Sequence, residues 1–336
     1  MRSEFEYIVV IGASAGGVAA LLAISEALPR FFPAPVCIVQ HIGGNTSVLP
    51  ELLRYRGANH AIHPEDGQRL TNGTLLVAPP DLHMLVDGDS IRLRHGPKEN
   101  HSRPAIDPLF RSAALRWGPK VIGVVLTGQM DDGTAGLKAV KQCGGIAIVQ
   151  DPVTATEPEM PASALANVDV DYCVPLEEIG PLLVQLVGGA QAPRRAPAPE
   201  HVAREVAINE GEANVENLTS IADPSPLTCP DCGGGLWEMK DTRPLRYRCH
   251  VGHAYSALSL AHAQRQGAEE ALWSSVRALR EREMLMRRLA SIATATGDVD
   301  QAAAGQAKAD HLRQQIRQLQ EFAEQLPPDV EADTAA

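Results

Sequence analysis

The chain is poor in aromatic side chains, in basic charge and in long apolar runs. Only 4% of its 336 residues are aromatic, while 44% are hydrophobic. The core must therefore be built mainly from Val, Ile, Leu and Ala, a composition that suits a buried parallel sheet. Basic residues number 30 against 41 acidic ones, for a formal net charge of -11. Because nucleic acids and anionic lipids attract a positive surface, we expect neither as a partner.

No apolar segment has the length of a membrane span, which needs ~18 residues. The apolar run at 7–11 is also too short for a secretory signal, and Glu4 and Glu6 stand where such a signal carries basic residues. Three of the six cysteines are scattered through apolar segments, and the other three lie together near residue 240. This pattern is typical of reduced thiols plus a metal cluster, so we expect a cytoplasmic protein without membrane insertion.

Strand-like and helix-like patterns alternate from residue 7 to about 188. β-Branched runs predict strands at 7–11, 36–40, 74–78, 121–126 and 146–150. Helical spacing of apolar residues predicts helices at 18–28, 108–117 and 135–143. The segment 83–95 instead predicts an antiparallel hairpin that turns at Asp87-Gly88-Asp89. Together these patterns predict an α/β fold of three layers, with a doubly wound, mostly parallel sheet.

The length predicts more than one domain, because single domains usually have about 100 to 200 residues. We assign a hydrolase-like domain to 1–190, and a helical hairpin, broken near Thr296-Gly297-Asp298, to 259–326. The remaining expected parts are an acidic flexible linker (191–225), a zinc-ribbon-like module (226–258) and a disordered tail (327–336).

Ser14 stands in the pattern G-x-S-x-G, directly after the first predicted strand and before the first helix. A serine at such a turn is exposed at the end of the sheet, and the following helix offers backbone N–H groups to developing negative charge. A glycine-rich turn of this kind also packs or binds phosphates in many α/β folds. The dinucleotide alternative expects an acidic residue at the end of the second strand. Gln40-His41 stands there instead, which favours proton chemistry.

His41 ends the second predicted strand, and Asp131 and Asp132 follow the strand at 121–126. The carboxyl ends of neighbouring parallel strands meet at one crevice, so we expect these side chains to lie near Ser14. One carboxylate can then orient the imidazole and stabilise its protonated form. The alternatives are a structural histidine and helix capping by the aspartates.

Residues 7 to about 188 resemble the catalytic domain of the chemotaxis protein-glutamate methylesterase family. The matching stretches are IGASAGG around Ser14, VQHI around His41, APPDLHM at 78–84, SRPAIDPLFRSAA at 102–114 and LTGQMDDGTAGL around Asp132. The resemblance implies Ser14 as nucleophile, His41 as general base and acid, and Asp132, which precedes Gly133, as the carboxylate of the triad. It implies no cofactor for catalysis.

The resemblance also implies a substrate: glutamate methyl esters on the cytoplasmic helices of chemoreceptors, with deamidation of glutamine in some members. A separate receptor methyltransferase or response regulator is a further expected partner. Asp131 stands where the family usually has asparagine, and Met130 replaces a glycine in the loop that helps to form the oxyanion hole. Since the first catalytic strand begins at residue 7, we expect no attached receiver domain.

Cys229, Cys232, Cys249 and His253 have the spacing C-x2-C-x16-C-x3-H. Two such knuckles provide tetrahedral ligands for Zn2+, and a module of about 30 residues needs a metal because its core is small. His253 is preferred to His250 because Gly252 lets the chain turn before the imidazole. With four protein ligands the site is structural. A redox Cys-x-x-Cys is the alternative, although it has no use for Cys249 and His253.

The sequence thus supports two functional hypotheses. The first is an active methylesterase of chemotaxis-type signal transduction. The second is a weakly active or inactive adaptor that binds signalling partners through its zinc ribbon and helices. The intact triad favours the enzyme, and the altered loop at 129–131 favours the adaptor.

Overall fold

The computed structural model describes residues 5–42, 46–189, 197–241 and 243–325. It divides into two compact units, 1–260 and 261–336. The predicted tail at 327–336 lies outside the described residues.

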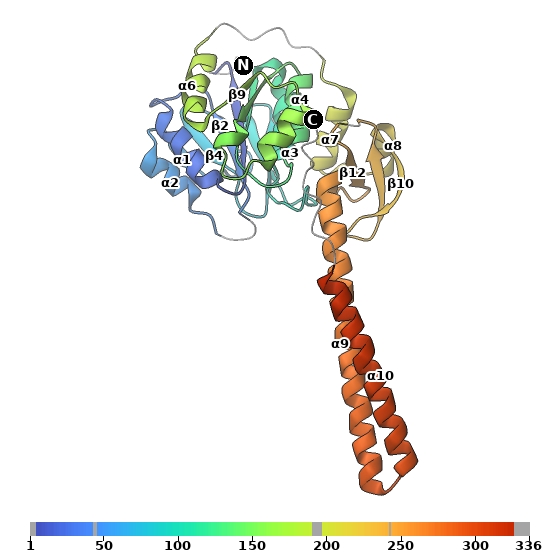
Figure 1. Ribbon diagram of the computed structural model, residues 1–336. Helices are drawn as coiled ribbons and strands as arrows, with labels where there is room; N and C mark the ends of the chain where they lie inside the picture. The colour runs from blue at the N-terminus through green and yellow to red at the C-terminus, as the bar shows by residue number, and fades with distance from the viewer. Residues whose placement is uncertain (1–4, 43–45, 190–196, 242, 326–336) are drawn as a thin grey trace. The chain divides into compact units, whose positions relative to one another are not determined.

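A seven-stranded sheet, in which all neighbouring pairs run parallel, forms the centre of the first unit (Figure 1). Its spatial order is β3-β4-β2-β1-β7-β8-β9. The strands are β1 (Ile8–Ala13), β2 (Val36–Gln40), β3 (His60–Ile62), β4 (Thr74–Val77), β7 (Val121–Val125), β8 (Ile146–Gln150) and β9 (Tyr172–Val174). Because β2 and β7 lie on opposite sides of β1 and all three strands run parallel, their carboxyl ends lie next to one another at one edge of the sheet.

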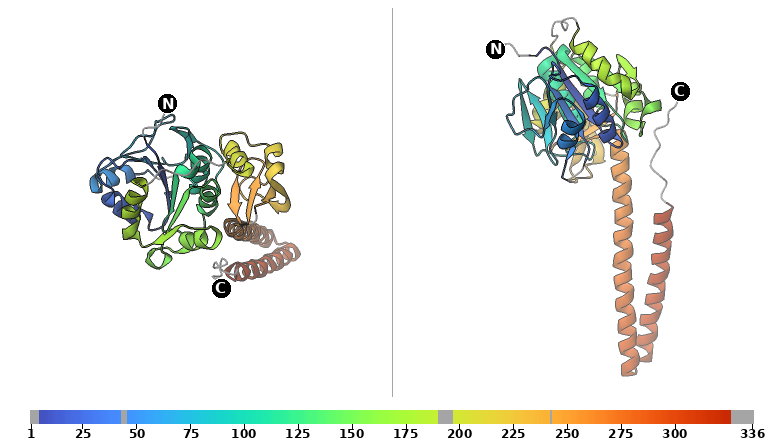
Figure 2. Two further views of the ribbon diagram at one scale, coloured as in Figure 1. Left: turned by 90° about the horizontal axis from the view of Figure 1, so that it is seen from above. Right: turned by 90° about the vertical axis from the view of Figure 1, so that its left-hand side faces the viewer.

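Helices cover both faces of this sheet (Figure 2). Because strand side chains alternate between faces, Val9 and Ile11 of β1 pack in one apolar cluster and Ile8 and Val10 in the other. The first cluster includes α1 (Gly17–Ala27), α2 (Leu49–Arg56) and α6 (Leu176–Val187). The second includes α3 (Ile106–Trp117), α4 (Thr134–Gln142), α5 (Glu159–Asn167) and the hairpin of β5 (His83–Asp87) and β6 (Ser90–Arg94).

The predicted fold class is confirmed: the sheet is parallel, lies between two helical layers and carries the hairpin at 83–95. The predicted pair of C-terminal helices is also present. Elements with short or mixed patterns were not predicted. These are β3, β9, α2, α5 and α6.

The prediction of a flexible linker at 191–225 is wrong over two helices, α7 (Glu200–Asn209) and α8 (Val215–Ile221). Val202 and Val206, four residues apart, are both buried on one side of α7. Glu205 is buried as well, with its charge balanced by arginines. The acidic composition of the segment therefore does not keep it in solvent. Residues 190–196 lie outside the described residues.

A second, four-stranded antiparallel sheet belongs to the same unit. It consists of β10 (Ala222–Thr228), β11 (Gly235–Met239), β12 (Arg246–Cys249) and β13 (Ala254–Ser256), and is called the small sheet below. Its apolar side chains are divided between two small clusters, one that joins Ala222 and Met239 to α7 and α8, and one with Cys229, Leu236, Cys249, Tyr255 and Leu260. A core of this size contributes little stability by burial alone.

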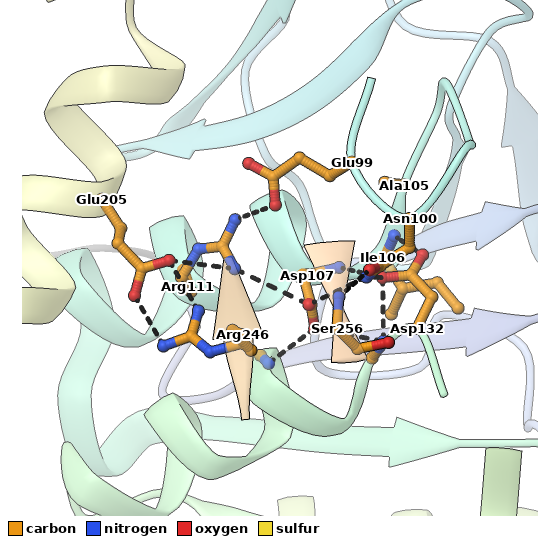
Figure 3. Close-up of polar contacts among 12 residues, drawn as sticks. Glu99, Asn100, Ala105, Ile106, Asp107, Arg111, Asp132, Glu205, Arg246 and Ser256 are labelled. Carbon is orange, nitrogen blue, oxygen red and sulfur yellow. Dashed lines mark hydrogen bonds and ion pairs between the residues drawn. The ribbon is translucent and has the colours of Figure 1, made fainter. Parts of the chain in front are cut away.

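Buried ion pairs join the small sheet to α3 and α7 (Figure 3). Arg246 Nη1 lies 2.7 Å from Glu205 Oε2, and Arg248 Nη2 lies 2.9 Å from Glu99 Oε1. Arg111 of α3 pairs with both Glu99 and Glu205. Burial alone would raise the pKa of each glutamate, but the arginine charges outweigh burial and hold both pKa values well below their ordinary range.

Two long helices form the second unit. Helix α9 (Ala257–Thr296) begins at the end of the first unit, and α10 (Val299–Glu324) follows a turn at Gly297 and Asp298. The Asp298 side chain accepts a hydrogen bond from Gln301 N and so caps α10. Glu283 of α9 pairs with Arg313 of α10 at 3.2 Å. Among the described residues, no helix is both long and apolar enough to cross a membrane.

Substitution Glu205→Ala is expected to lower the free energy of unfolding of the first unit by about 3 to 5 kcal/mol, because it leaves the buried Arg246 without its glutamate and removes one of the two glutamates that pair with Arg111 and Arg248. Urea unfolding followed by tryptophan fluorescence measures this loss. The matched control on the same helix is Glu200→Ala, whose exposed carboxylate pairs with Arg204. We expect the control to change stability by less than about 0.5 kcal/mol. Equal unfolding midpoints for the two variants would contradict the assigned role of Glu205.

Candidate active site

Three neighbouring strands present the candidate residues at one edge of the main sheet. Ser14 directly follows β1, His41 directly follows β2, and Asp132 lies in the loop between β7 and α4. Backbone hydrogen bonds tie these strand ends together, since His41 N donates to Ala13 O at 3.1 Å and Ser14 N donates to Thr127 O at 3.0 Å. The structure thus brings together the residues that the parallel-sheet pattern and the family resemblance selected.

The imidazole of His41 bridges the serine and the aspartate. Its Nδ1 lies 3.2 Å from Ser14 Oγ, and its Nε2 lies 2.8 Å from Asp132 Oδ2. A carboxylate only accepts, so the imidazole Nε2–H donates to Asp132 and the lone pair of Nδ1 faces the serine hydroxyl. The Asp132 side chain is 5% exposed and that of His41 16%. This arrangement can take a proton from Ser14 and stabilise the imidazolium that results.

Asp132 is buried and receives hydrogen bonds from several N–H groups (Figure 3). Ile106 N donates to Oδ2 at 2.7 Å, while Gly133 N and the Asn100 side chain donate to Oδ1 at 2.9 and 3.1 Å. Burial acts to raise the pKa of Asp132, but the hydrogen bond from His41 and these donors outweigh burial and lower it. The carboxylate is therefore ionised and ready to pair with a protonated imidazole.

The backbone just after Ser14 lies against the Gln40 side chain, and glycines make this close contact possible. The Gln40 side-chain N–H donates to Ser14 O at 2.7 Å and to His41 O at 3.0 Å. A Cβ on Gly17 would lie 2.1 Å from Gln40 Oε1 and 2.6 Å from the Cβ of Ala13, which cannot move aside, so only glycine fits there. Gly16 caps α1 with a φ of 77°, in the left-handed region. Gly17, the residue after the G-x-S-x-G pattern, thus leaves room for one buried amide to join the first two strand ends.

The loop at 127–132 passes close to Ser14. A Cβ on Gly128 would lie 2.7 Å from the Cβ of Ser14. Met130 has a φ of 63°, and its N–H donates to Glu159 Oε2 at 2.6 Å. The backbone amide at the position where the family usually has glycine is therefore bound to a carboxylate.

Asp131, the neighbour of Asp132, is covered by the small sheet. The hydroxyl of Ser256, the last residue of β13, donates to Asp131 Oδ1 at 2.7 Å. Burial raises the pKa of Asp131 to about 6, and the nearby charge of Asp132 adds to this effect. An ionisable side chain stands at this buried position, where the family usually has a neutral one.

The four metal-ligand candidates lie together in the first unit. The ligand atoms of Cys229, Cys232, Cys249 and His253 are all within 4.8 Å of one another. The Cys232 and Cys249 sulfurs are 3.8 Å apart, and His253 Nδ1 lies 3.7 Å from Cys229 Sγ and 3.6 Å from Cys249 Sγ. Tetrahedral Zn2+ with ordinary bond lengths needs about 3.8 Å between sulfurs and about 3.6 Å between sulfur and nitrogen. The donor set therefore fits this metal.

His250, the alternative ligand, points elsewhere. Its ring contacts Trp237 edge-on, with 6.0 Å between ring centroids. Among the described residues, the group whose ligand atoms lie within 4.8 Å of one another includes His253 but not His250.

Comparison with known proteins agrees with this geometry. The sequence pattern described as CheB methylesterase matches residues 9–183, which is half of the chain. The chain belongs to the CheB methylesterase family. A relative from Leptospira interrogans is 40% identical over 184 residues, or 53% of this chain and 93% of that protein. Its name gives the activity as protein-glutamate methylesterase/protein-glutamine glutaminase, in provisional form.

Two further relatives extend the comparison. A protein-glutamate methylesterase/protein-glutamine glutaminase from Moorella thermoacetica is 38% identical over 189 residues, which cover 54% of this chain and 45% of that one. The crystal structure of the Thermotoga maritima CheB methylesterase catalytic domain is 36% identical, with a TM-score of 0.52. It covers 54% of this chain, and 98% of that domain is matched. The family pattern ends at residue 183, before the small sheet.

Sequence reasoning missed Asn100, Glu159 and Ser256, which contact the triad carboxylate or its loop. None of them lies at the carboxyl end of β1, β2 or β7, so the expectation that functional side chains gather at these strand ends could not select them. A signal was present for Asn100 alone, since it lies just before the family stretch at 102–114.

Substitution Asp131→Asn is expected to stabilise the protein increasingly as the pH rises. The folded protein binds the Asp131 proton more tightly than the unfolded chain, because the pKa is about 6 instead of 3.8. Wild-type stability therefore falls between about pH 4 and about pH 6, and the variant escapes this loss. The difference in free energy of unfolding between the variant and wild type should grow by about 3 kcal/mol over that range and then stay constant. Urea unfolding from about pH 4 to about pH 8 measures it.

The control is Asp169→Asn, at an exposed aspartate. We expect its stability to keep a constant difference from wild type across the same pH range. A flat difference for Asp131→Asn as well would contradict the raised pKa.

Proposed function

We propose that the protein hydrolyses glutamate methyl esters on chemoreceptors, with Ser14, His41 and Asp132 as its catalytic triad. Family membership makes the protein a carboxyl-ester hydrolase. The observation that supports the triad is the continuous contact from Ser14 Oγ to His41 Nδ1 at 3.2 Å and from His41 Nε2 to Asp132 Oδ2 at 2.8 Å. A hydroxyl beside an imidazole that is in turn held by a carboxylate is an activated nucleophile.

The reaction follows from these contacts. Ser14 Oγ attacks the ester carbonyl while His41 Nδ1 takes its proton, and Asp132 stabilises the imidazolium. The protonated imidazole then gives the proton to the methoxy oxygen, so methanol leaves and an acyl-enzyme remains. Water attacks the acyl-enzyme with His41 again as base, which releases the glutamate carboxylate and restores Ser14. The same steps on a glutamine side chain release ammonia. Catalysis requires no cofactor.

The substrate class is the cytoplasmic helices of methylated chemoreceptors, which places the protein in the cytoplasm. The names of the Leptospira and Moorella relatives support methyl esters of protein glutamate as the substrate and a second activity on protein glutamine, while the receptor as the carrier of these groups follows from the family resemblance. A receptor methyltransferase or a response regulator acting on the same receptors is a further candidate partner.

An adaptor with a weakly active hydrolase domain is the second candidate function. The observation that favours it lies at residue 130, where the backbone N–H donates to Glu159 Oε2. If this loop supplies donors to the oxyanion, a carboxylate bound there competes with the developing negative charge.

Cys229, Cys232, Cys249 and His253 bind one structural Zn2+ in this proposal. The support is the distances among their ligand atoms, which fit tetrahedral coordination. The metal would add the stability that the few core residues of the small sheet do not supply. Asp231 and Tyr255 stand beside the ligands, because the Tyr255 hydroxyl contacts both Asp231 and the Cys229 sulfur.

A fluorophosphonate probe is expected to label wild-type protein at Ser14 and to leave Ser14→Ala unlabelled.

Methanol release from a methylated receptor fragment should fall by about 10²- to 10⁴-fold in His41→Ala, because the general base is lost. His60→Ala is the matched control, since His60 is exposed and begins β3, at the amino ends of the parallel strands and thus at the opposite edge of the sheet from the candidate triad. Folded wild type that neither reacts with the probe nor releases methanol would support the adaptor.

Metal analysis of the purified protein is expected to find one Zn2+ per chain. Substitution His253→Ala should weaken zinc binding by at least about tenfold, because one of four ligands is lost. The matched control His250→Ala should keep the affinity of wild type. Competition with a chromogenic chelator measures both affinities, and the reverse order of the two variants would contradict the proposed ligand set.

A further inference from the structure

The segment that leads into α3 is attached to the small sheet. Ala254 N donates to Lys98 O at 3.3 Å, and Asn100 N donates back to Ala254 O at 2.9 Å, so Glu99 and Ala254 form a parallel bridge. Just beyond, His101 Nε2 hydrogen-bonds Ser259 O at 2.7 Å. Hydrogen bonds to β13 and to the first turn of α9 therefore fix the backbone path of residues 98–101, all within the first unit.

The backbone of this segment needs such support. Asn100 and His101 have φ values of 48° and 64°, and both lie in the left-handed region. Two consecutive residues with side chains rarely adopt it, and they do so where the surrounding structure holds them. The contacts from Ala254 and Ser259 provide that hold.

The side chain of Asn100 connects the small sheet to the triad (Figure 3). Its Oδ1 accepts from Ser256 N at 2.9 Å and from Ser259 Oγ at 3.0 Å. Because a backbone N–H can only donate, the amide oxygen must face Ser256. The amide nitrogen then faces Asp132 and donates to Oδ1 at 3.1 Å. Ser256 and Ser259 thus decide which end of the amide reaches the carboxylate.

We propose that Asn100 is a positioning residue of the esterase, through which β13 and the first turn of α9 hold the Asp132 carboxylate in its catalytic orientation. The inference rests on the proposed function, in which Asp132 orients His41. It makes the segment after the family domain a part of the catalytic apparatus.

The two oxygens of Asp132 have different tasks in this arrangement. Oδ2 accepts from His41 and from Ile106 N, and Oδ1 accepts from Asn100, from Gly133 N and, at 3.3 Å, from Asp107 N at the start of α3. Donors on Oδ1 fix the plane of the carboxylate and so direct Oδ2 at the imidazole. Gly133 N belongs to the loop of Asp132 itself, whereas Asn100 is placed by residues 254–259. Asn100 is therefore the donor through which a change in the small sheet reaches the triad.

The test uses the full chain with Asn100→Gly, which removes the amide but tolerates the left-handed backbone. We expect kcat for methyl-ester hydrolysis to fall about tenfold, as for loss of a hydrogen bond to a charged group. KM should stay within about twofold, because the substrate does not contact Asn100 in the proposed role. An unchanged kcat would overturn the proposal.

A double-mutant cycle separates positioning from a general effect on folding. In an Asp132→Ala background, Asn100→Gly should not lower the rate of Ser14 labelling by fluorophosphonate any further, because the group it positions is gone. A loss as large as in the wild-type background would show a general structural role and overturn the proposal.

The link to α9 is tested by Ser259→Ala, which removes one donor to the amide oxygen. We expect a fall in kcat of about two- to fivefold, as for a hydrogen bond between neutral groups, and no further fall when Asn100→Gly is already present. The matched control is Ser275→Ala on the same helix, whose hydroxyl bonds Ala271 O and whose loss should leave kcat unchanged. Additive effects of Ser259→Ala and Asn100→Gly would overturn the link.

The outcomes also distinguish this inference from the proposed function. Zinc-loaded wild type that neither hydrolyses the ester nor reacts with the probe would overturn both. Active wild type with a fully active Asn100→Gly variant would overturn the positioning role alone.

Discussion

A buried carboxylate at residue 132 is the constraint on which the rest of this structure depends. An ionised group removed from water is stable only where donors replace its hydration shell. Here the donors come from β2 through His41, from the start of α3 through Ile106 N, and from the side chain of Asn100. The main sheet, the helical layer and the segment before α3 must all be in place before Asp132 can be charged, and the charge in turn holds His41 against Ser14.

Other buried charged groups near Asp132 also need partners of opposite charge. Asp107, at the start of α3, is buried beside Asp132, and burial together with that charge raises its pKa to about 7. Arg111, one helical turn further, acts in the opposite direction and reaches Glu99 and Glu205. Through these glutamates the network continues to the arginines of the small sheet. The hydrolase domain and the small sheet therefore share one buried set of charges, which explains why they form one compact unit.

The sequence was informative where chemistry follows a regular element. Ser14, His41 and the pair Asp131 and Asp132 could be found because each follows a β-branched run, and parallel strands end at the same edge. The choice of Asp132 within that pair came from the family resemblance. Glu205 could not be found in this way, because its arginine partners are distant in sequence and a local reading sees only an acidic segment. Asn100 lies in a left-handed turn without periodicity, and its role depends on β13, more than 150 residues further along the chain.

The position of β13 links the two proposed sites. Its first residue, Ala254, directly follows the metal-ligand candidate His253, and Cys249 ends the preceding strand β12. A metal bound there fixes the hairpin from which Ala254 and Ser256 reach residues 98–101. Because the small sheet has few apolar core residues of its own, its strand positions depend on the buried ion pairs and, in the proposed arrangement, on the metal. Under the proposal, the orientation of Asp132 depends on a module that lies beyond the matched family region, and the reactivity of the site would respond to whatever stabilises or displaces that module.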